Sequence, residues 1–210
     1  MSQIQQSSTE SSTESLIKGL TESLTKCSTE DLTKGLSKES QRILKSPDFS
    51  DKICLFARFW DSKDCKESPD SLFIFGDNDQ GRGLGGQAVI RNCANSMGIP
   101  TKKFPSYNDQ SYYTDQEYDV NCKTILDAVD RIIINSTKYN ELVFPLNGFG
   151  IGLSCLPEKA PRTLKYLNDL LEACFDIEYE SIQKNGMCAE IDVKDNNLKK
   201  EIENYSKNNS

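Results

Sequence analysis

The chain has 210 residues, of which 36% are hydrophobic, and a formal net charge of −7 at pH 7. This length favours one domain of ordinary size with tails, and the absence of a basic segment argues against an extended nucleic-acid surface or an anionic-membrane patch. The sequence has 8 dispersed cysteines and no histidine, which excludes Ser-His-Asp and Cys-His catalysis within the chain and removes the commonest zinc ligand.

The cysteines form no C-x-x-C pair, and the N-terminus lacks the pattern of a signal peptide. We therefore expect reduced thiols in an intracellular, cytoplasmic protein. No apolar run approaches the ~20 residues that span a bilayer, so no membrane partner is expected. We predict no metal site and no cofactor.

An eight-residue unit recurs near the N-terminus, with copies that begin at Thr13, Thr21 and Thr29. Each copy has a glutamate four residues before a lysine, the favourable order on a helix. A period of eight, however, moves the leucines around the helix instead of keeping them on one seam. We predict that residues 1–50 are a low-complexity tail that is disordered or weakly helical. The alternative is an amphipathic helix that binds a protein partner.

The folded domain is predicted for residues 51–176 and begins with a buried strand at 53–60. A second strand at 72–75 leads into a glycine-rich loop and then a helix at 87–97, with Ala88, Val89, Cys93 and Met97 facing inward. An extended segment follows at 101–105, bracketed by prolines.

The second half of the domain repeats this order. A capping box at 114–117 predicts a helix that runs to about Asn135 and has Val120 among its inward residues. A third strand at 141–144 leads to a second glycine loop at 147–152, and Pro157 begins a helix to about Phe175 that is inward at Leu164. Residues 177–210 are a polar extension in which 187–193 is a candidate edge strand. The order of elements predicts a three-layer α/β fold with a largely parallel sheet and flanking helices.

The first glycine loop matches the dinucleotide-binding pattern G-x-G-x-x-G at Gly81, Gly83 and Gly86. The pattern lies too far from the strand, and lysines stand where an acidic residue should meet the ribose, so a classical dinucleotide fold is not predicted. Asp77 and Asn78 can instead bond ribose hydroxyls while the amides of both loops cradle a pyrophosphate. The alternative is a turn whose glycines only permit tight packing.

The candidate site combines the two loops with the segment between them, because ligands bind beyond the carboxyl ends of parallel strands. If the chain is an enzyme, Asp77 is the natural general base and Asn78 holds the ribose. Four aromatic residues are candidates for stacking on a base: Tyr107, Tyr112, Tyr113 and Phe149. The predicted ligand-binding residues are Gly76, Arg82, Gly83, Gly85, Gly86, Gln87, Thr101, Lys102, Lys103, Asn147, Gly148, Phe149, Gly150, Ile151 and Gly152.

These motifs resemble a domain family of unassigned activity from phage, bacterial and large-virus genomes. The resemblance is carried by F-G-D-N at 75–78, G-x-G-G-Q-A at 83–88, G-I-P-T-K-K at 98–103 and P-x-x-G-x-G-x-G-L at 145–153. More distantly, the plan is similar to macro domains, which bind ADP-ribose. That similarity implies a macro-domain-like sheet, with Asn78 near the distal ribose and residues 148–152 near the diphosphate. The macro-domain aspartate that binds adenine has no match here.

We therefore expect a small-molecule nucleotide ligand, ADP-ribose or a relative, which the domain binds and, if it is an enzyme, hydrolyses or processes. The alternative is a non-catalytic module that senses a nucleotide or binds a partner.

Overall fold

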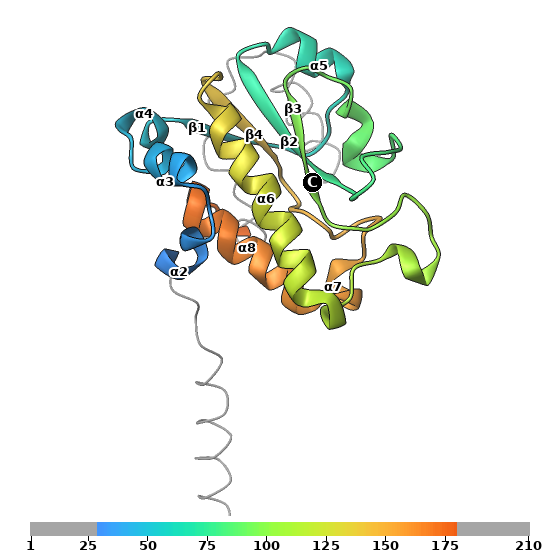
Figure 1. Cartoon of the computed structure of the whole chain (residues 1–210). Coiled ribbons are helices and arrows are strands. Elements are labelled where there is room, and N and C mark those ends of the chain that lie inside the picture. The colour runs from blue at the N-terminus through green and yellow to red at the C-terminus, as the bar shows by residue number, and fades with distance from the viewer. Residues whose placement is uncertain (1–28, 180–210) are drawn as a thin grey trace, which may run out of the picture.

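The structure, a computed structural model, describes residues 29–179 (Figure 1). Its centre is a four-stranded sheet with the order β1-β4-β2-β3, in which every neighbouring pair is parallel. The strands are β1 (Ile53–Ala57), β2 (Ser71–Asp77), β3 (Ser96–Pro100) and β4 (Glu141–Pro145). In a parallel sheet the carboxyl ends of all strands lie at one edge, so the loops after β2, β3 and β4 meet there.

Strand β2 is buried on both faces of the sheet. Its side chains alternate, so that Leu72 and Ile74 join one hydrophobic cluster while Phe73 and Phe75 join a second cluster on the opposite face. A parallel strand covered on both sides reads as a continuous apolar run because neither face needs polar residues. This explains why residues 72–75 could be recognised as a strand.

Helices cover both faces of the sheet, which gives three layers. The larger cluster packs under α6 (Tyr118–Ser136) and α8 (Pro161–Phe175); in Figure 1, α6 crosses in front of the strands and α8 lies next to it. The smaller cluster packs under α5 (Ser62–Glu67) and the short 3-10 helix η1 (Gly86–Ile90), with Trp60 between them. The predicted α/β fold with a parallel sheet and flanking helices is confirmed.

The predicted helix at 87–97 is wrong. Residues 86–90 form only η1, and residues 96–100 form β3 at the edge of the sheet. Gly98 and Pro100 hide this strand, because both residue types are depleted in strands. Gly98 is required there, since a Cβ at this position would lie 2.5 Å from Oδ2 of Asp77. Val89, predicted to face inward, is 38% exposed.

Two further helix predictions need correction. Helix α6 begins at Tyr118, after a 3-10 turn at Asp115–Glu117, and Val120 is 68% exposed instead of inward. The helix expected from Pro157 is two helices, α7 (Leu156–Lys159) and α8, because Pro161 starts a new helix. The Asp115 carboxylate accepts hydrogen bonds from the backbone amides of Arg162 and Thr163, and so caps α8 from another segment.

Part of the predicted N-terminal tail is folded onto the domain. Residues 29–50 form α2 (Thr29–Lys34), α3 (Lys38–Leu44) and α4 (Pro47–Ser50). Leu32, Leu36 and Ile43 are buried in the larger cluster, against α6 and α8. The predictions for residues 1–28, and for the C-terminal extension from residue 180 on with its edge strand at 187–193, lie outside the described residues.

None of the described helices is both long enough and apolar enough to cross a membrane.

Candidate functional site

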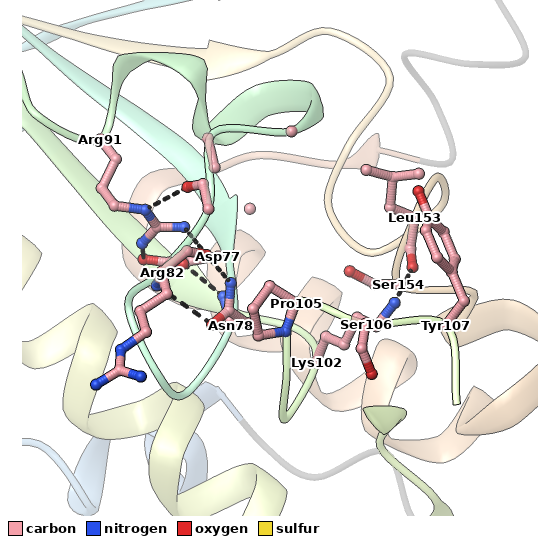
Figure 2. Close-up of a pocket in the computed structure, with 14 residues that line it drawn as sticks. Asp77, Asn78, Arg82, Arg91, Lys102, Pro105, Ser106, Tyr107, Leu153 and Ser154 are labelled. Atoms are coloured by element: carbon pink, nitrogen blue, oxygen red, sulfur yellow. Dashed lines mark hydrogen bonds and ion pairs between the residues drawn. The ribbon is translucent and has the colours of Figure 1, made fainter. Parts of the chain in front are cut away.

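A cavity of about 180 Å³ opens at the carboxyl edge of the sheet (Figure 2). Its wall comes from three segments that follow β2, β3 and β4: the first glycine loop with η1, residues 102–107, and residues 153–154. Asp77, Asn78, Arg82 and Lys102 line it together, so the structure brings these predicted residues to one place. Gly76, Gly83 and Gly85 also line the cavity.

Asn78 closes the first glycine loop on itself. Its Nδ2 donates to the carbonyl of Arg82 at 2.8 Å, and its Oδ1 accepts the Arg82 amide at 3.4 Å. Gly81 and Gly83 have φ values of 57° and 82°, which L-residues with side chains rarely adopt. The asparagine side chain therefore shapes the loop, as the turn interpretation of Asp77-Asn78 predicts.

Asp77 and Arg91 form a partly buried ion pair behind this loop, with side chains 13% and 12% exposed. Oδ2 of Asp77 contacts Nη1 of Arg91, and Oδ1 accepts the amide of Asn78. Arg91 also donates from Nε to the carbonyl of Gly83 at 2.9 Å, and its guanidinium lies 5.5 Å from the ring centroid of Phe75. Both carboxylate oxygens of Asp77 thus have partners, and one of these partners is the arginine that holds the loop.

Gln87 connects the two glycine loops. Its Oε1 accepts the amide of Gly76 at 2.7 Å, while its Nε2 donates to the carbonyl of Gly148 at 3.0 Å. Its own carbonyl accepts Nε1 of Trp60 at 2.9 Å. Every polar group of this side chain serves the fold, and Gln87 does not line the cavity. Gly86 and Thr101 do not line it either, but Oγ1 of Thr101 lies 2.7 Å from Oγ of Ser154, which does.

Lys102 is the most unusual group of the site. The residue is 5% exposed, and its Nζ donates to the carbonyl of Leu153 at 2.8 Å. The ammonium lies 4.1 Å from the ring centroid of Tyr112, and burial lowers the pKa of the amino group. Among residues 29–179, no carboxylate lies within ion-pair distance of it. A carbonyl dipole and aromatic rings therefore take the place of a carboxylate partner.

Lys103 and the second glycine loop lie outside the cavity wall. Lys103 pairs with Glu117. In the loop, Phe149 is 1% exposed, and a Cβ on Gly150 would lie 2.3 Å from Cδ1 of Leu156. Asn147, Gly148, Ile151 and Gly152 do not line the cavity either. The second loop contributes through the residues that follow it, Leu153 and Ser154.

The first loop offers unpaired backbone donors. The amides of Gly83, Leu84 and Gly85 donate no hydrogen bond to any residue between 29 and 179. Gly83 and Gly85 face the cavity, and the exposed side chain of Arg82 stands beside them. Free amides next to cationic side chains are the donor set that proteins use for phosphate and other anions.

Sequence reasoning missed Arg91 and Ser154. Neither lies in a glycine motif. Arg91 is placed at the cavity by the short helix η1, which it follows, and Ser154 by the turn after the second glycine loop. No group of three or more cysteine and acidic side chains in the described part of the chain could hold a metal ion, and the six cysteines there are free.

A family model described as a family of unknown function (DUF7831) matches residues 55–170 of the chain. This match begins within β1, ends within α8 and includes all three segments of the cavity wall. No curated protein and no solved structure matches the chain.

Proposed function

The chain belongs to the family of unknown function DUF7831, and we propose that it binds ADP-ribose or a related nucleotide, with a phosphate held in the cavity beside Lys102. The observation that carries this is the buried charge of that lysine, which no described carboxylate pairs with, in the wall of an open cavity. A buried charge without an anionic partner is costly, and a phosphate oxygen in the cavity would supply that partner.

The size of the cavity limits what enters it. Pockets that enclose a whole small-molecule ligand have volumes of roughly 300–1,000 Å³, and this cavity has about 180 Å³. It therefore accepts a phosphate with part of its sugar, and the rest of the ligand lies outside. The glycine loop that follows β2 supplies the free amides, so we assign the phosphate to the first loop. The resemblance to macro domains instead implies residues 148–152 for the diphosphate.

The likeness to macro domains supports the same ligand class. Both have an asparagine-bearing glycine loop at the carboxyl end of a parallel strand and a second glycine loop nearby. The roles differ in this chain, because Asn78 braces its own loop and the second loop packs against Leu156. The proposed phosphate position therefore rests on the cavity of this chain, and the macro-domain resemblance supports only the class of ligand.

A non-catalytic nucleotide-sensing module is the second candidate, and one observation favours it over a hydrolase. Both oxygens of the Asp77 carboxylate already hold partners, Arg91 and the amide of Asn78, which leaves this group badly placed to take a proton from water. Incubation with ADP-ribose and with an ADP-ribosylated peptide, followed by mass spectrometry, separates the candidates. Product formation that is lost in Asp77→Asn supports the hydrolase.

Replacement of Gly85 tests the phosphate assignment. Gly85 has φ −84°, so any residue fits its backbone, and a Cβ would lie 3.4 Å from Cδ1 of Leu153. Gly85→Asp places a negative charge at the phosphate position, while Gly85→Asn adds the same volume without charge. By calorimetry with ADP-ribose, we expect Gly85→Asp to bind at least about tenfold more weakly than Gly85→Asn, a difference of about 1.4 kcal/mol.

Two outcomes would contradict the proposal. One is wild-type protein that binds neither ADP-ribose nor AMP at millimolar concentration. The other is equal affinity of the Asp and Asn variants, which would put the phosphate elsewhere.

A further inference from the structure

We infer that the ligand carries an aromatic base and that Tyr107, together with Leu153, forms the platform for that base at the mouth of the cavity. This inference depends on the nucleotide binding proposed above, which it makes more specific. It starts from the volume of the cavity, because a ligand whose charged end alone fits inside must place its remaining surface on the rim.

The rim is apolar where it could have been polar. Tyr107 is 77% exposed and Leu153 is 49% exposed, and both line the cavity. Pro105 also lines the cavity and is exposed. Large apolar side chains exposed beside a cavity are typical of ligand-binding surfaces.

Tyr107 is the aromatic candidate that remains available for stacking. Of the four residues that the sequence suggested, Tyr112, Tyr113 and Phe149 are 8%, 1% and 1% exposed. Tyr112 lies under Lys102, Tyr113 donates to the carboxylate of Asp79, and Phe149 packs against Tyr179. Their rings are therefore committed to the fold.

Lys102 links the platform to the anion site. Its Nζ lies 5.2 Å from the ring centroid of Tyr107 and 2.8 Å from the carbonyl oxygen of Leu153 (Figure 2). The buried ammonium of Lys102 thus contacts both platform residues, and Lys102 also lines the cavity. A nucleotide that leaves its phosphate near Lys102 has its base within reach of the exposed Tyr107 ring.

The chemical class that fits both parts is a small nucleotide with a stacked base. A sugar phosphate would use the cavity and leave the rim in water. A nucleic-acid strand is disfavoured by the net charge of −7, because the backbone phosphates need an extended basic surface. Base-aromatic stacking tolerates every base, so the platform selects for a base without reading its identity.

The test compares AMP with ribose 5-phosphate, which share the sugar and phosphate and differ by the base. We expect wild-type protein to bind AMP about tenfold or more tightly than ribose 5-phosphate, the range that stacking on one aromatic ring supplies. Tyr107→Ala should remove most of this preference by weakening AMP binding while leaving ribose 5-phosphate binding unchanged. Tyr107→Phe should retain the preference.

Phe59→Ala is the matched control, since Phe59 is 68% exposed and does not line the cavity; it should leave both affinities unchanged. The inference is overturned if wild type shows no preference for AMP, or if the preference survives in Tyr107→Ala. Either result, with ribose 5-phosphate still bound, leaves the phosphate site standing. Binding of neither compound by wild type would overturn the proposed function as well.

Discussion

The side chain of Lys102 is buried, and its ammonium donates to one backbone carbonyl while no described carboxylate pairs with it. Burying such a charge lowers the stability of the fold, but the charge can attract an anionic ligand. Lys102→Met keeps an unbranched side chain of similar length, one heavy atom shorter, and removes the charge. We expect this variant to lose binding of ribose 5-phosphate and AMP by about tenfold or more. Its free energy of unfolding should equal that of wild type or exceed it by about 1 kcal/mol.

Lys159→Met is the control for this substitution. Lys159 also lies over the ring of Tyr112, at 5.3 Å, but its side chain is 42% exposed and it pairs with Asp109. Calorimetry should find unchanged binding for it. Urea denaturation measures the stability of both variants, and a loss of about 2 kcal/mol or more in Lys102→Met would show that the lysine serves the fold instead.

The pH dependence of stability gives a second readout for Lys102. Burial lowers the pKa of its amino group below the ordinary value of 10.5. Between the lowered pKa and 10.5, the unfolded chain keeps a proton that the folded chain has released. The free energy of unfolding of wild type should therefore rise with pH in this window relative to Lys102→Met. If the difference in unfolding free energy between the two proteins did not change with pH in this window, burial would not lower the pKa of Lys102.

Some site residues could be predicted from the sequence because of how a parallel sheet is built. Asp77 ends the strand predicted at 72–75 and Asn78 follows it, and ligands bind beyond the carboxyl ends of parallel strands. Lys102 is predicted from its charge alone, because β3, which precedes it, is not recognised as a strand in the sequence. Their bonding partners could not be predicted in the same way. Arg91 reaches Asp77 only because η1 turns the chain back across the end of β2, and the contact spans 14 residues without a local pattern.

At the scale of elements, the two glycine loops have different reasons for their glycines. The first loop needs close approach and positive φ in the cavity wall, at Gly83. The second loop needs them for packing, since Gly150 has a φ of 73° and a Cβ there would also lie 3.0 Å from Cβ of the buried Leu156. The spacing of the glycines in the sequence is similar in both loops, so it could not show which loop lines a binding cavity and which one packs in the fold. Strand β3 is hard to recognise for a related reason. Its Gly98 is needed because the Asp77 side chain of the neighbouring strand leaves no room for a Cβ, and a glycine in the sequence disfavours a strand prediction.

Substitutions in the second loop should therefore change stability according to packing. Gly150→Ala is expected to destabilise the protein by about 2 kcal/mol or more, from the left-handed backbone and the clash with Leu156. Gly152→Ala is the matched variant, because a Cβ there meets no atom within 4 Å, and it should stay within about 0.5 kcal/mol of wild type. Urea denaturation measures both. Equal stability of the two variants would refute the packing role of Gly150.

At the scale of the whole molecule, the N-terminal helices that stabilise the fold and the loops that form the cavity lie on different sides of the domain. Figure 1 shows α3 and α4 on one side of the sheet and the loop after β3 on the other. The N-terminal helices belong to the stabilising side: the Ser37 amide donates to Asp130 of α6 at 2.8 Å, and Gln41 Nε2 donates to the carbonyl of Leu36 at 3.0 Å. The period of the N-terminal repeat fits no helix face and therefore predicts a tail. Its last copy nevertheless forms α2, which packs against α8 with Leu32 in the larger hydrophobic cluster.

Truncation of Leu36 tests this separation. Leu36 is 4% exposed and belongs to the larger hydrophobic cluster, so Leu36→Ala should lower the free energy of unfolding by about 2–4 kcal/mol. Val120→Ala, at a site that is 68% exposed on α6, should change it by less than about 0.5 kcal/mol. Where both variants remain folded, calorimetry should find AMP affinity equal to that of wild type, because neither residue lines the cavity. A Leu36→Ala protein of unchanged stability would mean that residues 29–50 do not pack on α6 and α8 in solution, and weakened AMP binding in a folded variant would mean that the two sides of the domain are coupled.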